Sequence, residues 1–70
     1  MWILTEEYND YDQHGEYFLH AWLFKPTKSQ LLEHVDGSLL DHILAGGGRL
    51  GTEHVWYYLR ELHNEIKTVI

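Results

Sequence analysis

The sequence has no cysteine, one proline and only five lysine or arginine residues among 70. The absence of cysteine excludes disulfide bonds and thiolate metal sites, and it is typical of proteins in a reducing cytoplasm. A small chain without such cross-links must gain its stability in another way. The three Trp, five Tyr and two Phe residues therefore indicate an aromatic core, dimerisation, or both.

Long hydrophobic runs are also missing. No apolar stretch approaches the roughly 20 residues that a membrane span needs, and residues 1–10 (MWILTEEYND) lack the basic start and small-residue cleavage site of a signal peptide. The length predicts one domain over residues 1–70 with a small core, which buries only about 60% of the unfolded surface. We therefore expect a soluble, cytoplasmic protein of marginal stability with no membrane partner.

Positive charge is scarce. Eleven Asp and Glu against five Lys and Arg give a formal net charge of −6, so phosphate groups would be repelled and direct binding of nucleic acid is disfavoured. The expected partners are basic or apolar protein surfaces. Residues 6–16 contain no Lys or Arg, and they hold a set that we call the acidic cluster: Glu6, Glu7, Asp10, Asp12 and Glu16. The cluster is either a solvated hairpin tip that maintains solubility or a binding surface that competes for a site built to hold DNA or RNA.

The first 25 residues predict two strands and a turn. Residues 1–8 alternate in polarity, which indicates a strand with one strongly apolar face. Residues 9–15 (NDYDQHG) are rich in turn formers, and Gly15 can take the positive φ that closes a hairpin. Residues 16–25 predict a second strand with two apolar faces. One face carries Tyr17, Leu19, Ala21 and Leu23, and the other carries Phe18, His20, Trp22 and Phe24.

A short helix is predicted after the second strand. Pro26 ends that strand because it has no backbone N–H to donate. Thr27 or Ser29 is the expected N-cap of the helix. The apolar side chains at helical spacing are Leu31, Leu32 and Val35.

A second short helix is predicted at residues 39–45. Residues 36–38 (DGS) break the first helix, and Ser38 with Asp41 resembles a capping box. The glycine run at residues 46–48 stops the helix. The two helices are expected to form a helical hairpin on a sheet.

Residues 52–62 (TEHVWYYLREL) predict the strand against which the rest of the chain packs, because aromatic and β-branched side chains occupy both faces. A helix over residues 55–66 is the alternative, since apolar residues also recur there at helical spacing. The strand is favoured because HVWYY is poor helix material and the sheet needs a third member. Residues 66–70 (IKTVI) predict a short last strand or a tail.

These elements predict an α+β fold with the order β-β-α-α-β. Two short helices pack on one face of a small antiparallel sheet. Apolar side chains on the other face of the second strand need cover of their own. A homodimer whose interface holds Phe18, Trp22 and Phe24 would provide this cover, and it is one candidate role for the chain.

Catalytic and metal-binding patterns are not apparent. The six histidines are scattered without the close spacing of zinc ligands, and no HExxH motif occurs. With no cysteine, and with Ser29 and Ser38 as the only serines, there is no candidate nucleophile in a catalytic setting. We predict no enzyme activity, no cofactor and no metal.

The loop at residues 46–51 (GGGRLG) is the most distinctive short motif. Gly47, Gly48 and Arg49 form a candidate anion site, since consecutive backbone N–H groups beside a guanidinium can hold a phosphate or carboxylate. The loop lacks the Lys and Ser/Thr of a P-loop, and a helix precedes it where a phosphate site would have one following. A helix C-cap leading into the strand is the alternative interpretation.

The stretches MWILTEEYNDYDQHGEYF, KPTKSQL and GGGRLGTEHVWYYLREL together resemble a type of short accessory protein encoded by tailed bacteriophages. The likeness covers nearly the whole chain, although its motifs are structural and no family-wide activity accompanies them. Small acidic phage proteins often bind and block host or defence proteins, as anti-CRISPR proteins and DNA mimics do. The resemblance thus implies an inhibitor in the cytoplasm of the host bacterium.

On this interpretation the partner is a host or defence protein with a basic surface, such as a nucleic-acid-handling or CRISPR-type complex. The acidic cluster would steer the encounter. Exposed aromatic side chains near it would act as anchors, namely Tyr8, Tyr11 and Tyr17.

Overall fold

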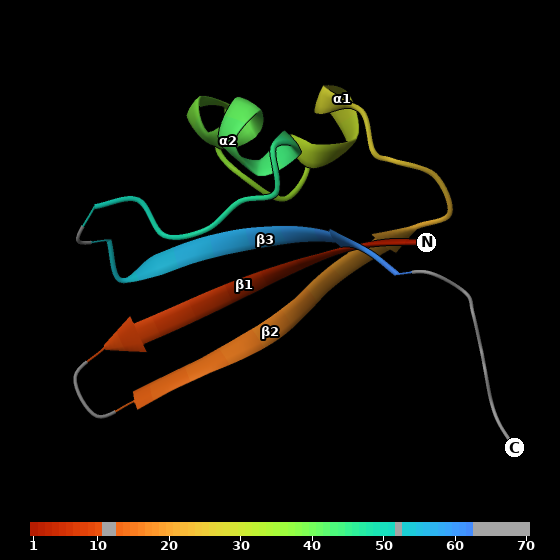
Figure 1. The fold of residues 1–70 in the computed structure, drawn as a ribbon. Helices are drawn as coiled ribbons and strands as arrows, with labels where there is room; N and C mark the ends of the chain where they lie inside the picture. Colours follow the sequence, from red (N-terminus) through yellow and green to blue (C-terminus); the bar gives the residue numbers. More distant parts are fainter. Residues whose placement is uncertain (11–12, 52, 63–70) are drawn as a thin grey trace, which may run out of the picture.

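The computed structural model describes residues 1–10, 13–51 and 53–62 (Figure 1). In chain order the elements are β1 (Trp2–Asp10), β2 (Gln13–Trp22), α1 (Lys28–Leu31), the 3-10 helix η1 (Gly37–Leu39), α2 (Leu40–Leu44) and β3 (Val55–Glu61). The predicted α+β fold and its β-β-α-α-β order are confirmed. Because β3 is a strand, the helix alternative for this segment is wrong. The last strand predicted at residues 66–70 lies outside the described residues.

β1 is the central strand of a three-stranded antiparallel sheet with the order β2-β1-β3. The prediction gave the organising position to residues 52–62, and this was wrong, because β3 is an edge strand. After the hairpin and the helices, the chain returns to the edge of β1 that β2 leaves free. Leu4 in β1 consequently pairs with His20 on one side and Leu59 on the other, and its side chain is 0% exposed.

The hairpin between β1 and β2 is longer than predicted. β1 runs to Asp10 and β2 starts at Gln13, so most of the predicted turn at residues 9–15 is strand. Gly15 is a strand residue opposite Tyr8, and its expected role in closing the turn was wrong. Each added pair satisfies further backbone N–H and C=O groups, and this gain outweighs the turn preference of the residue types.

A β-bulge in β2 changes which side chains share a face. Leu4 pairs with His20 while Thr5 pairs with Phe18, which makes Leu19 the extra residue. The strict alternation predicted for residues 16–25 is therefore wrong beyond the bulge. On the helix side β2 carries Gly15, Tyr17, His20 and Trp22, and on the open side it carries Glu16, Phe18 and Ala21.

The hydrophobic core lies between the sheet and the helices. Its buried members are Leu4, Leu31, Val35, Ile43 and Leu59. In Figure 1 the helical segment lies over one face of the sheet, and no element within the described residues covers the opposite face. Packing of the helices on a single face is thus confirmed, and the sheet keeps an open face.

α1 begins with a capping box at Thr27, one of the two N-caps expected. The Gln30 backbone N donates to Thr27 Oγ1 (3.3 Å), and the Thr27 backbone N donates to Gln30 Oε1 (2.9 Å). This reciprocal pair fixes the start of a helix of only four residues. The helix in turn places Leu31 in the core.

The capping box predicted for Ser38 and Asp41 does not form. Asp36 accepts a hydrogen bond from the Ser38 backbone N (2.9 Å) and starts η1, a local bond for which the short Asp side chain is well suited. Asp41 instead lies 3.3 Å from Lys28 Nζ. The turn of 3-10 helix therefore replaces the expected N-terminus of α2.

The glycine run after α2 lies against the outer edge of β3. Gly47 forms an antiparallel bridge with Tyr58, and Gly48 N donates to the Tyr57 carbonyl (2.8 Å). A Cβ on Gly47 would overlap the Tyr57 carbonyl oxygen, and the φ of Gly47 is +88°. Only glycine fits both requirements. The outer edge of β2, in contrast, meets no strand within the described residues.

Candidate binding site

Two tyrosines stack near the hairpin end of the sheet, which extends past the helical layer (Figure 1). The Tyr8 and Tyr17 ring centroids are 5.4 Å apart and their planes differ by 13°. A Cβ at Gly15 would lie 3.0 Å from Tyr8 Cε1, so the absence of a side chain there makes room for the ring. Gly15 thus allows Tyr8 to cross β2 and reach Tyr17.

The Tyr8–Tyr17 pair offers aromatic surface with polar ends. A side-chain hydrogen bond with Tyr17, and repulsion from that group when ionised, raise the pKa of Tyr8. Tyr8 therefore stays neutral at physiological pH. Tyr17 is 54% exposed, and exposed tyrosines with a fixed orientation are frequent anchors in protein interfaces.

The sheet divides the acidic cluster between its two faces. Glu6 and Asp10 share the helix-side face with Tyr8, because residues two apart on a strand point the same way. Glu7 and Glu16 are cross-strand partners on the open face. The continuous acidic surface suggested by the sequence is therefore two smaller groups.

One of these groups lies beside the tyrosine stack. We call it the hairpin site, and its members are Glu6, Tyr8, Asp10 and Tyr17. Tyr11, a predicted anchor, and Asp12, a member of the acidic cluster, lie outside the described residues.

Glu16 is held by a cation of the same chain. Arg60 Nη1 and Thr5 Oγ1 both donate to Glu16 Oε2, at 2.9 and 2.7 Å. The hydrogen bond from Thr5 and the interaction with Arg60 hold the pKa of Glu16 below its usual value. The same guanidinium lies 4.2 Å from the centroid of the Tyr58 ring. The charge of Glu16 is thus largely compensated on the open face.

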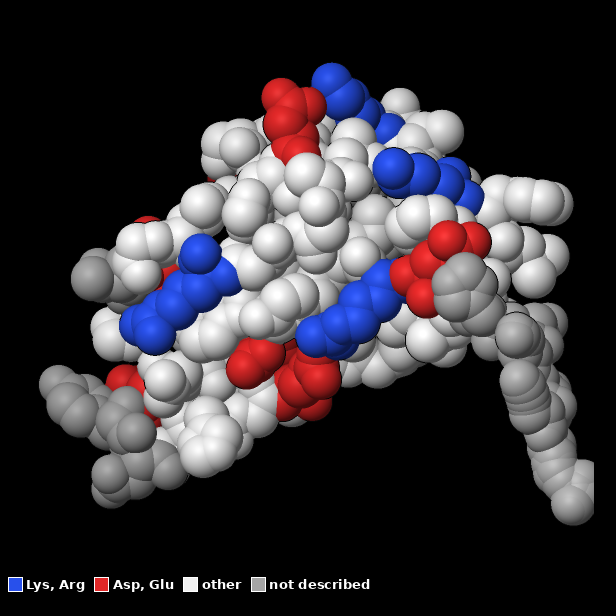
Figure 2. All heavy atoms as spheres, viewed as in Figure 1, with Lys and Arg blue, Asp and Glu red and all other residues white. Residues whose placement is uncertain are grey.

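Acidic and basic side chains are interspersed over the visible face of the molecule. Figure 2 shows Lys and Arg next to Asp and Glu at several places. The described residues also form the ion pairs Lys28–Asp41 and Arg60–Glu16. The surplus of negative charge does not form one broad field on this face.

The donors of the predicted anion loop are engaged within the protein. They are Gly47, Gly48 and Arg49. Gly47 N donates to the His42 carbonyl (3.0 Å), Gly48 N donates to the Tyr57 carbonyl (2.8 Å), and Arg49 Nε donates to the Glu53 carbonyl (3.0 Å). The Arg49 guanidinium also lies 5.0 Å from the centroid of the Trp56 ring. The two glycine bonds connect the end of α2 to β3, so these two backbone N–H groups are engaged within the protein in this conformation.

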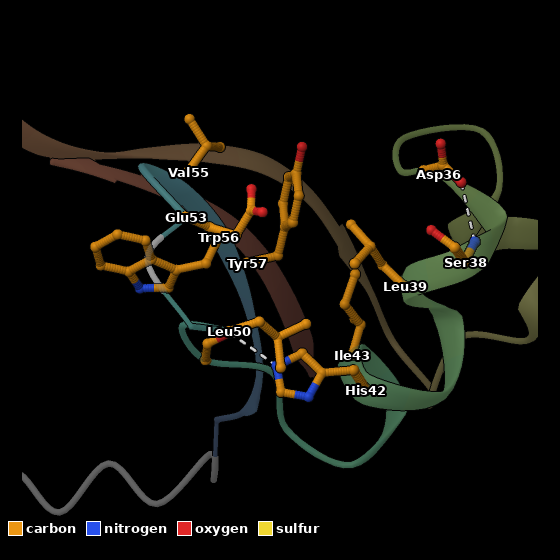
Figure 3. Close-up of a pocket in the computed structure, with 11 residues that line it drawn as sticks. Asp36, Ser38, Leu39, His42, Ile43, Leu50, Glu53, Val55, Trp56 and Tyr57 are labelled. Carbon is orange, nitrogen blue, oxygen red and sulfur yellow. Dashed lines mark hydrogen bonds between the residues drawn. The ribbon is translucent and has the colours of Figure 1, made fainter. Parts of the chain in front are cut away.

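A pocket of about 300 Å³ lies between the helical segment and β3 (Figure 3). Its apolar lining consists of Leu39, Ile43, Leu50, Val55 and the buried Trp56. Its polar lining includes Asp36, Ser38, His42, Glu53 and Tyr57. In Figure 3, Asp36 and Ser38 lie on the far side of Leu39 from Tyr57, and His42 lies at the base.

The pocket is electronegative. Its lining contains two carboxylates, Asp36 and Glu53, and neither lysine nor arginine. Hydrogen bonding from the Ser38 backbone lowers the pKa of Asp36. Burial and the nearby charge of Glu6 raise the pKa of Tyr57, so Tyr57 remains a neutral donor. Groups of this kind favour a cationic ligand over an anionic one.

Sequence reasoning missed this pocket. Its residues all lie within residues 36–57, and they converge because the glycine loop returns the chain to β3. Each residue taken alone is an ordinary core, cap or loop residue. The only signal in the sequence was the glycine run itself, which indicates a close approach of two backbone segments.

A cluster of aromatic and imidazole rings is a second unpredicted feature. The ring centroids of His20 and His34 are 4.9 Å apart, those of His20 and Trp22 are 4.7 Å apart, and those of Trp22 and His34 are 5.8 Å apart. The bulge at Leu19 did not appear in the sequence pattern. The cluster packs the segment after α1 onto β2.

Within residues 1–10, 13–51 and 53–62, no group of three or more His, Cys, Asp or Glu is arranged to hold a metal ion. None of the helices in this part of the chain has the length and hydrophobicity required to cross a bilayer. Comparison with known proteins found no match among protein-family models, curated proteins or solved structures.

Proposed function

We propose that this protein is a non-enzymatic phage accessory protein that binds and inhibits a bacterial host or defence protein through the hairpin site. The observation that carries the proposal is the Tyr8–Tyr17 stack (5.4 Å), which shares one face of the hairpin with two carboxylates. Rigid aromatic anchors beside negative charge complement a surface rich in Arg and Lys. The phage setting and the class of target rest on the resemblance of the sequence.

The proposed mechanism is steric occupation of a basic surface. The net charge of −6 increases the encounter rate with a positively charged partner. The stacked tyrosines then pack against the stems and heads of its basic side chains. A nucleic-acid-handling protein whose basic surface is covered in this way can no longer bind its phosphates.

A plasmid-interference assay in a bacterium with an active CRISPR system tests the proposal. The wild-type protein should restore transformation by a targeted plasmid, and Tyr17→Ala and Asp10→Lys should each reduce this restoration. The matched control is Glu33→Lys, which makes the same charge change at an exposed position outside the hairpin site. Circular dichroism of each variant verifies that the fold is retained.

Two results would overturn the proposal. One is equal transformation with the wild-type protein and with an empty vector across several defence systems. The other is equal loss of activity in the hairpin variants and in Glu33→Lys, which would assign the effect to net charge and not to the hairpin site.

A homodimer is the second candidate, and the free edge of β2 favours it. β2 presents an outer edge without a partner strand in the described residues, and Phe18 beside it on the open face is 65% exposed. Unpaired edges of this length tend to pair with another strand. The bulge places Trp22 on the opposite face, so the predicted interface of Phe18, Trp22 and Phe24 must be revised to the edge and open face. Sedimentation at micromolar concentration separates a dimer from a monomer.

A further inference from the structure

We propose that the pocket between η1, α2 and β3 receives an arginine side chain of the partner. This inference rests on the proposed function and adds the contact that anchors the complex. The pocket volume of about 300 Å³ lies at the lower end of the range for ligand sites. It is large enough for one long side chain and too small for a large cofactor.

The charge of the pocket selects a cation. Glu53 and Asp36 belong to the lining, which has no lysine or arginine, and Glu6 lies beside Tyr57 and influences its ionisation. The Asp36 carboxylate is already held by the Ser38 amide (2.9 Å), which fixes its position without neutralising it. The Glu53 carboxylate has no ion pair within the described residues.

The walls of the pocket favour guanidinium over ammonium. Leu39, Ile43 and Val55 offer apolar surface, and Tyr57 adds an aromatic ring. A guanidinium group is planar and weakly hydrated, and it stacks on aromatic rings. An ammonium group is compact and strongly hydrated, so it loses more hydration energy in an apolar setting.

Arg49, the arginine of this chain that lies within the same stretch of sequence as the pocket residues, does not occupy the pocket. Arg49 donates to the Glu53 carbonyl (3.0 Å) and lies against the Trp56 ring. The neighbouring residue, Leu50, lines the pocket, whereas Arg49 does not. Arg49 thus contacts two residues of the lining from outside, and its guanidinium leaves the pocket itself open to a side chain of another molecule.

The pocket is continuous with the hairpin site. Val55 of the pocket pairs across the sheet with Tyr8, and Tyr57 pairs with Glu6. Cross-strand partners share a face of the sheet, so both sites lie on the helix side of β1 and β3. A single partner surface can therefore contact the stacked tyrosines while one of its arginines enters the pocket.

The experiment is a titration of the 15N-labelled protein with N-acetyl-arginine amide, followed by NMR. N-acetyl-citrulline amide is the control ligand, because it keeps the shape of the side chain and lacks its charge. We expect saturable shifts at the amides of Leu39, Ile43 and Tyr57 with the arginine probe. The affinity for the citrulline probe should be lower by a factor of about five or more. The corresponding lysine probe should bind more weakly than the arginine probe.

Variants locate the charge that is responsible. Glu53→Gln should weaken binding of the arginine probe about threefold, and combining it with Asp36→Asn, which can still accept from Ser38, should weaken binding further. Glu33→Gln makes the same charge change at an exposed residue outside the pocket. It should leave the affinity unchanged.

Equal binding of both probes, no saturable shifts at the pocket, or identical effects of Glu53→Gln and Glu33→Gln would overturn this inference. The titration requires no partner, so its failure is distinct from failure of the proposed function. If the pocket binds no guanidinium while the hairpin variants lose inhibition, the function stands and the pocket is not its anchor. If the pocket binds arginine while the interference assay shows no inhibition, the reverse holds.

Discussion

At the scale of single residues, Gly47 has no room for a side chain. A Cβ would overlap the Tyr57 carbonyl, and the φ of +88° is unfavourable for other residues. We expect Gly47→Ala to lower the free energy of unfolding by more than about 2 kcal/mol. Urea denaturation monitored by tryptophan fluorescence measures this change.

Gly51 provides the control for Gly47. Its φ is +58°, and a Cβ there would meet nothing within 4 Å. Gly51→Ala should lower the free energy of unfolding by only about 1 kcal/mol, because the unfavourable positive φ is present without the steric overlap. Equal costs at the two positions would show that the contact of Gly47 with β3 contributes little.

Glu16 makes stability depend on pH. Its pKa is held below the usual value of 4.5 by Thr5 and Arg60. A carboxyl whose folded pKa is lowered stabilises the protein above its unfolded pKa, and this contribution disappears as the pH falls through the folded pKa. The wild type should therefore be more stable than Glu16→Gln at about pH 7, and the difference should be smaller at about pH 3.

Paired denaturation curves at the two pH values check the prediction for Glu16. Glu33→Gln serves as the reference, since Glu33 is exposed and takes no part in the Thr5–Arg60 contacts. A difference between wild type and Glu16→Gln that stays constant with pH would contradict the role of the Glu16 charge.

The sequence predicted which acidic and aromatic residues lie near the hairpin, but it did not predict how their side chains are arranged. Tyr8 and Tyr17 were predicted as anchors, but the stacking of their rings was not predicted. Glu16 was predicted to face a partner, yet it contacts Arg60, which lies 44 residues away in sequence. Pairing at such a separation depends on strand register, and a single sequence does not reveal register before the bulge is known.

At the scale of elements, the capping box decides whether α1 forms. A helix of four residues has little intrinsic stability, so its first turn depends on the Thr27–Gln30 pair. Thr27→Ala should lower the free energy of unfolding by about 1 kcal/mol. Ser29→Ala, at the alternative N-cap, should change it by less than about 0.5 kcal/mol.

Thermal denaturation of both variants tests the prediction for α1. The two substitutions remove the same kind of side-chain hydroxyl two residues apart, so the comparison isolates the cap. If Ser29→Ala is as destabilising as Thr27→Ala, the hydroxyl at Thr27 is not the group that starts the helix.

The elements themselves were largely predictable, whereas their ends and relative positions were not. The strand at residues 55–61 followed from its aromatic and β-branched residues. The turn at residues 9–15 failed because ladder pairing outweighs the preferences of turn residues. The central place of β1 was also missed, since strand order depends on which edge is free when the chain returns, and that is a property of the tertiary path.

At the scale of the whole molecule, the sheet has one packed face and one open face. Two adjacent residues of β1 point to opposite faces, so substituting each one tests one face. Leu4 is fully buried beneath the helices (0% exposed), and Ile3 pairs with Ala21 and Arg60 on the other side. We expect Leu4→Ala to lower the free energy of unfolding by about 3 kcal/mol, which is a large part of the stability of a domain this size. Ile3→Ala should cost about 1 kcal/mol, since its side chain is only half-buried.

Urea denaturation of the two variants over a range of protein concentrations distinguishes a monomer from a dimer that hides the open face. In a monomer both costs are independent of concentration, and Leu4→Ala is clearly the larger. If the open face is covered by a second copy, Ile3→Ala removes buried contacts in the dimer, so its cost should approach that of Leu4→Ala and the unfolding midpoint should rise with protein concentration. The ratio of the two costs therefore tests whether the open face of the sheet is in contact with water.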